Sequence, residues 1–119
     1  MDEQKKPMVY TITETAAVRM IESAGDQIDI AADLLDDNVA KDPLDMKLIS
    51  CLCDLFSSNY HVRKTLRLNL SSGTIEDEKS KEKIILLEEK DLIILENAIL
   101  STAFTKKELL KLNYSIVLH

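Results

Sequence analysis

The chain is poor in the residues that form tight turns and aromatic cores. Its 119 residues include two glycines, two prolines, two phenylalanines, three tyrosines and no tryptophan. Sandwiches and barrels of many strands need frequent turns, which glycine and proline favour, so their scarcity disfavours such folds. A core with so few aromatic rings must be built from aliphatic side chains. The length fits one domain that spans residues 1–119.

Long apolar stretches are also missing. The longest uninterrupted aliphatic runs, Ile84–Leu87 and Leu92–Leu95, have four residues each, whereas a membrane-spanning helix needs ~20. Residues 1–7 are not followed by the apolar segment of a signal peptide. Cys51 and Cys53 would point in different directions on a helix and so could not bridge each other. We therefore expect reduced thiols and a cytoplasmic protein without membrane contact.

Groups that commonly support catalysis are scarce. The only histidines are His61 and His119, and no glycine-rich phosphate loop is present. The Cys51-x-Cys53 pair beside His61 lacks the second pair of ligands that a zinc site requires. We therefore assign no catalytic residue, no metal ligand and no cofactor, and we expect a protein that is not an enzyme.

Two stretches carry apolar positions at the 4-3-4-3-4 spacing of a helix that packs along another helix. The first predicts a helix over residues 14–38, in which Gly25 would permit close helix approach. The second helix should begin at Asp42-Pro43-Leu44-Asp45, with Asp42 as its N-cap. A short turn between two long helices makes them antiparallel neighbours. The two seams are Ala17, Ile21, Ala24, Ile28, Ala31 and Leu35, and Leu44, Leu48, Cys51, Leu55, Ser58 and Val62.

Alternating apolar residues predict short strands outside this hairpin. Residues 8–13 and 65–70 both alternate, and 84–87 is apolar on every side. Residues 74–83 are strongly polar, and 76–83 should be an exposed loop or a solvated helical turn. One continuous helix over 76–103 competes with the strand at 84–87, because Glu and Lys are good helix formers.

The last forty residues should be largely helical. A helix is expected from about Glu89 to Ala103, and a capping box at Thr105-Lys106-Lys107-Glu108 predicts a separate short helix. The tail alternates from Leu112 to Leu118 and is predicted to be an edge strand. The expected fold class is therefore α+β, mainly α: a long antiparallel helical hairpin with a few short strands and a C-terminal helical segment.

Acidic residues gather on the first predicted helix. Residues 22–45 hold eight acids and one base, a net charge of −7, whereas the whole chain has −6, so the remainder sums to +1. This excess of acid disfavours binding to nucleic acid. Four of these acids, from Asp26 to Asp36, are spaced 3-4-3 and so form one stripe along the helix. A fifth acid, Asp37, is the next residue. The expected partner-binding residues are Asp26, Asp29, Asp33, Asp36 and Asp37.

Three interpretations of this stripe remain open. It could be a solvated face whose negative charge is balanced by Arg63, Lys64 or Arg67. It could also be a docking surface for a basic protein, or a binding site for a divalent metal ion. Asp26-x-x-Asp29 and Asp33-x-x-Asp36 resemble the paired carboxylates of all-α nucleotide pyrophosphohydrolases, which implies a Mg²⁺-dependent hydrolase of nucleoside phosphates as the alternative function. In that family the pairs lie on facing helices, whereas here both lie on one.

Our leading hypothesis is a small acidic, non-catalytic protein-binding module. It would act as an adaptor, a chaperone or an inhibitor of a host factor through the helical hairpin and the acidic stripe. Two helices cannot cover all of their apolar positions, so we also expect a homodimer formed through the hairpin. The residues assigned to this self-association are Leu48, Leu52, Leu55 and Phe56.

Overall fold

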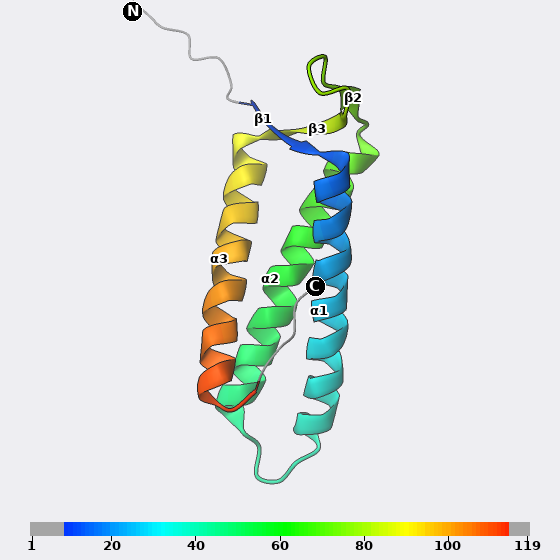
Figure 1. The fold of residues 1–119 in the computed structure, drawn as a ribbon. Helices are drawn as coiled ribbons and strands as arrows, with labels where there is room; N and C mark the ends of the chain where they lie inside the picture. The colour runs from blue at the N-terminus through cyan, green and yellow to red at the C-terminus, as the bar shows by residue number, and fades with distance from the viewer. Residues whose placement is uncertain (1–8, 115–119) are drawn as a thin grey trace, which may run out of the picture.

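Three helices and a small sheet make up the part of the chain that the structure, a computed structural model, describes, which is residues 9–114 (Figure 1). This confirms the expected fold class. In chain order the elements are β1 (Val9–Thr13), α1 (Glu14–Val39), α2 (Met46–Ser71), β2 (Ile75–Glu76), β3 (Lys83–Glu88) and α3 (Glu89–Lys111).

Helix α2 lies between the other two helices and runs antiparallel to both (Figure 1). Strand β1 leads directly into α1, and β3 leads directly into α3, so both helices start at the sheet and run the same way. No Cα atoms of α1 and α3 come within 8 Å of each other. The helices therefore form a layer with α2 in the middle and two flanking helices whose outer sides face away from it.

The sheet closes one end of this layer. Its order is β1-β3-β2 and all pairs are antiparallel, with Tyr10 opposite Leu87 and Ile12 opposite Ile85. Alternation along β3 turns Ile85 and Leu87 toward the helices, where both are buried, and leaves Leu86 exposed on the outer face. The strands expected at 8–13 and 84–87 are confirmed, with Met8 lying outside the described residues.

The core consists of two aliphatic clusters along α2. The cluster near the sheet joins Val62 and Leu66 of α2 to β3 and α3, and the other joins Leu48, Leu52 and Leu55 to Leu109 of α3. Helix α1 contributes mainly small residues, with Ala17, Ala24 and Ala31 all nearly inaccessible. These alanines let α1 approach α2. Both predicted seams are confirmed as packing faces except at Leu44, which is 48% exposed and lies outside α2.

Gly25 is not required for the close approach of α1 to α2. A Cβ atom added there would meet only Nη1 of Arg63, at 4.0 Å, which is ordinary van der Waals contact. The expectation that Gly25 permits close helix approach is therefore wrong, because the contact with α2 is made through the alanines on the neighbouring side of α1.

The predicted boundaries of α2 need correction at both ends. Asp45, not Asp42, is the N-cap: its Oδ1 accepts a hydrogen bond from the backbone N–H of Leu48 at 3.1 Å, and Leu44 stays outside the helix. The strand predicted at 65–70 is wrong, because the helix continues to Ser71. Thr65 and Leu66 are buried at helical spacing from Val62, so packing against the core outweighs the local alternation.

Helix α3 is longer than predicted. The separate helix at 105–108 is wrong, because Thr105 is a buried mid-helix residue whose neighbour one turn on, Leu109, is fully buried. The continuous helix over 76–103 is excluded by β3. Of the predicted tail strand, only 112–114 is described, and it forms a turn in which the N–H of Tyr114 donates to the carbonyl of Leu109 at 2.9 Å. The rest of that prediction lies outside the described residues.

Candidate functional site

The acidic face of α1 is the surface where the sequence placed its partner-binding residues. We use this name for Asp26, Asp29, Asp33, Asp36 and Asp37. All five side chains are exposed. At 100° per residue they cluster on the side of the helix opposite Ala24, Ile28 and Ala31, which pack toward α2. The helix therefore separates its packing side from its charged side, and the whole acidic face is open to solvent.

These carboxylates have no cationic partner in the described chain. The salt bridges found among residues 9–114 are Lys90–Glu88, at 3.8 Å, and Lys111–Glu108, at 2.9 Å, and both lie at α3. Arg63, the basic side chain that approaches α1, lies beside Gly25 without forming a salt bridge. Neutralisation of the stripe by Arg63, Lys64 or Arg67 is therefore not seen.

The geometry of the acids bears on the metal interpretation. Within residues 9–114, no group of three or more His, Cys, Asp or Glu side chains converges closely enough to hold a metal ion. The acidic face points away from α2, so Asp54 of that helix does not face it, and the two Asp-x-x-Asp pairs stay on one exposed surface. The facing arrangement of the pyrophosphohydrolases is thus not formed by these carboxylates.

The cysteines and histidine of α2 do not combine into a reactive site. Cys51 and His61 are ten residues apart on one helix, which separates them by about 15 Å. Cys51 is buried, and burial raises the pKa of its thiol, with Glu108 and Asp54 adding to the shift. Cys53 is exposed and free.

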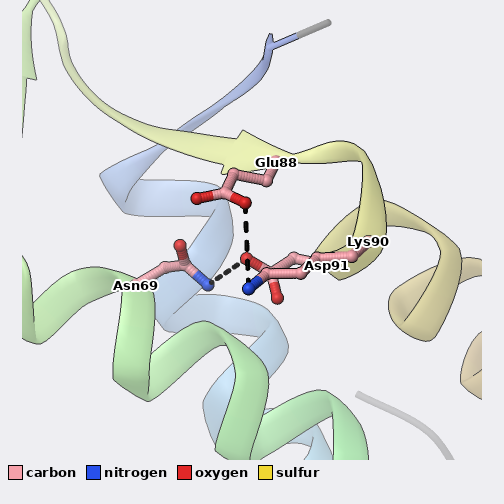
Figure 2. A network of polar contacts seen from close by, with 4 residues as sticks. All are labelled: Asn69, Glu88, Lys90 and Asp91. Atoms are coloured by element: carbon pink, nitrogen blue, oxygen red, sulfur yellow. Dashed lines mark hydrogen bonds and ion pairs between the residues drawn. The ribbon is translucent and has the colours of Figure 1, made fainter. Parts of the chain in front are cut away.

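A polar cluster links α2 to the start of α3 (Figure 2). Nδ2 of Asn69 donates to Oδ2 of Asp91 at 3.4 Å and also to the carbonyl of Thr65 at 2.8 Å, while Lys90 pairs with Glu88. Glu89 and Asp91 lie in the first turn of α3, where the helix dipole favours negative charge. The cluster therefore joins α2 to the first turn of α3, and we assign it a structural role.

The gap between α1 and α3 forms a groove of about 550 Å³ over α2. Its lining is mostly apolar, but it includes Lys106, whose pKa is lowered by burial, and Gln27, which is 6% exposed. Nε2 of Gln27 donates to Oγ of Ser23 at 3.2 Å, while Oε1 has no hydrogen-bond partner among the described residues. This groove could not be predicted from the sequence, because it arises from the separation of two helices that are distant in the chain.

The residues assigned to self-association mostly lie inside the protein. Leu48, Leu52 and Leu55 are at most 1% exposed and belong to the core cluster between the helices, and Phe56 is half-buried against it. Helices α1 and α3 cover the three leucines, so of the four residues only Phe56 keeps exposed surface. The large exposed apolar residues are instead concentrated on α3, which the sequence interpretation did not single out.

Comparison of the chain with protein-family models, with curated proteins and with solved structures finds no match in any of the three. None of the helices within residues 9–114 combines the length and the apolar character needed to cross a membrane.

Proposed function

We propose that the protein is a non-catalytic protein-binding module, an adaptor, chaperone or inhibitor of a host factor, which docks a basic partner on the acidic face of α1. The observation that carries the proposal is the set of five exposed carboxylates without a salt-bridge partner on one side of a single helix. We place this binding in the cytoplasm, because the free thiols Cys51 and Cys53 suit a reducing compartment.

The rigid spacing of the charges supports recognition. From Asp26 to Asp37 the helix rises by about 16 Å. The carboxylates from Asp26 to Asp36 are three or four residues apart, and Asp37 is four residues from Asp33. A partner with basic side chains on a helix or a strand can match several of these charges at once. Such complementarity chiefly raises the association rate and selects among partners.

A defined basic probe tests the proposal without knowledge of the natural partner. We choose a 20-residue helical peptide with lysines every third or fourth residue, and we measure its association rate with the protein by stopped-flow fluorescence. The stripe variant replaces Asp26, Asp29, Asp33 and Asp36 by Asn. The matched control removes the same number of charges elsewhere, through Glu76→Gln, Glu78→Gln, Glu82→Gln and Asp54→Asn; all four of these acids are exposed.

Both variants carry a net charge of −2, because each removes four negative charges from −6. In 50 mM salt the stripe variant should associate about tenfold more slowly than the wild type, and the control should stay close to the wild type. At 500 mM salt the difference should largely vanish, because the Debye length falls to about 4 Å. Equal slowing of both variants would show that only net charge matters and would contradict the proposal.

A further inference from the structure

The outer face of α3 carries an apolar stripe that the chain does not cover. Ile93, Leu100 and Phe104 are 49%, 68% and 65% exposed. Their spacings of seven and four residues place them on one side of the helix, opposite Leu95 and Thr102, which pack toward α2. Leu100 and Phe104 lie one turn apart, and Ile93 lies two turns before Leu100 on the same side. Large exposed apolar residues that gather on one side of a helix are typical of an interaction surface. We call this surface the α3 outer face.

Charged residues flank this stripe with opposite signs at its two ends. Glu89 and Glu96 lie on the same side of the helix in its first half, and Lys107 and Lys111 lie on that side in its second half. All four side chains are exposed. The face is thus negative near the sheet, where Ile93 lies between the two acids, and positive at the far end of the helix, with Leu100 and Phe104 between the two charged ends.

We propose that the α3 outer face binds the same face of a second copy of this chain, with the two α3 helices antiparallel. A twofold axis near Leu100 would bring Glu96 close to Lys107 of the second copy and Glu89 opposite its Lys111. Glu89 would there share that lysine with Glu108, which pairs with Lys111 at 2.9 Å within each chain. Each contact then occurs twice, as in any isologous twofold interface. A parallel arrangement would set like charges together, so the charge pattern selects the antiparallel one.

The geometry of the fold leaves the acidic faces free in this dimer. No Cα atom of α1 lies within 8 Å of α3, and the two helices flank α2 on different sides (Figure 1). The dimer would therefore present two acidic faces, one on each α1. This inference does not depend on what those faces bind.

The interface should be small and the dimer reversible. A helix of 23 residues is about 34 Å long, and one face of it supplies less than the ~800 Å² per partner of a standard interface. We therefore expect dissociation in the micromolar range. In sedimentation equilibrium from about 1 to 200 μM protein, the mean mass should rise from 13.5 kDa toward twice that value.

Paired substitutions locate the interface. Leu100→Glu with Phe104→Glu should weaken dimerisation at least about tenfold. The matched control, Met46→Glu with Leu68→Glu, alters two residues of α2 that are 63% and 58% exposed and should leave it unchanged. Circular dichroism should show that each variant is folded, because all four substituted side chains are exposed. A wild type that stays at 13.5 kDa throughout, or a dimer that survives the α3 substitutions, would overturn the proposal.

Charge exchange within one chain tests the orientation separately. Glu89→Lys with Glu96→Lys should weaken the antiparallel dimer, because the new lysines would face Lys111 and Lys107 of the second copy, and adding Lys107→Glu and Lys111→Glu to the same chain should restore it. In a parallel pair the first two changes only replace one like-charge contact by another. A dimer that the first two changes leave unaffected, or that the other two fail to restore, would overturn the antiparallel arrangement.

Discussion

Replacing the acidic face should stabilise the protein while impairing its proposed function. Like charges three or four residues apart on a helix repel each other, and each such pair costs about 0.2–0.5 kcal/mol. The stripe variant, with Asn at four positions, removes every one of these repulsions from the face. The pairs are Glu22–Asp26, Asp26–Asp29, Asp29–Asp33, Asp33–Asp36 and Asp33–Asp37.

The expected gain follows from these five pairs. Their sum is about 1–2.5 kcal/mol at low salt, and helix propensity changes little, because Asn and Asp are similar in a helix interior. Asp36 also lies near the C-terminal end of α1, where the helix dipole disfavours negative charge and no basic residue is present in the last turn. We therefore expect the free energy of unfolding to rise by about 1–2 kcal/mol, or the Tm by roughly 4–8 °C.

Urea unfolding followed by circular dichroism measures this gain. At 20 mM salt the stripe variant should unfold at higher urea than the wild type with an unchanged m-value. At 500 mM salt the gain should fall below half, because the Debye length becomes shorter than the spacing of the side chains. A loss of stability at low salt would refute the reasoning, since it would mean that these carboxylates make favourable contacts in the folded protein.

Two further substitutions test the packing. Gly25→Ala should stabilise the protein by about 0.5–1 kcal/mol in urea unfolding, because α1 gains helix propensity and the new Cβ has room beside Arg63; destabilisation would show that the helices need glycine there. Ser58 and Thr102 share a buried hydrogen bond of 2.7 Å between α2 and α3, so Ser58→Ala should cost about 1–2 kcal/mol by leaving the threonine hydroxyl unpaired. Adding Thr102→Val should then cost little more, and strictly additive losses would argue that the two hydroxyls do not interact.

The helical hairpin could be predicted from the sequence because its signal is repeated many times. Six positions on α1 and five on α2 share one spacing, and burial of Ala17, Ala24 and Ala31 against α2 follows that spacing. Short-range signals were less reliable where two of them competed. Asp42 and Asp45 both qualify as N-caps by residue type, and the hydrogen bond from Leu48 to Asp45 decides between them. Alternation at 65–70 resembles a strand, yet burial of Leu66 in the core holds it in α2.

Some surface features could likewise be predicted from the sequence and others could not. The exposure of Asp26 and its neighbours could be predicted, because charge on the side of α1 opposite the seam has only solvent to face. The burial of Leu52 and the exposure of Phe104 could not, because both depend on how α3 lies against α2. The prediction of self-association through the hairpin used helical spacing alone. Helical spacing does not show that α3 covers Leu48, Leu52 and Leu55. Which apolar residues stay uncovered is a tertiary property that helical spacing alone does not contain.

The most direct test of the acidic face as a docking surface is to map where the basic probe binds. Titration of the lysine peptide into ¹⁵N-labelled protein, followed by backbone amide chemical shifts, reports each residue separately. If the account is correct, the largest changes will lie on α1 between Asp26 and Asp37, and they will disappear in the stripe variant. Changes that are strongest in the acidic loop at 76–82, or that spread evenly over all exposed acids, would show that the face is merely solvated.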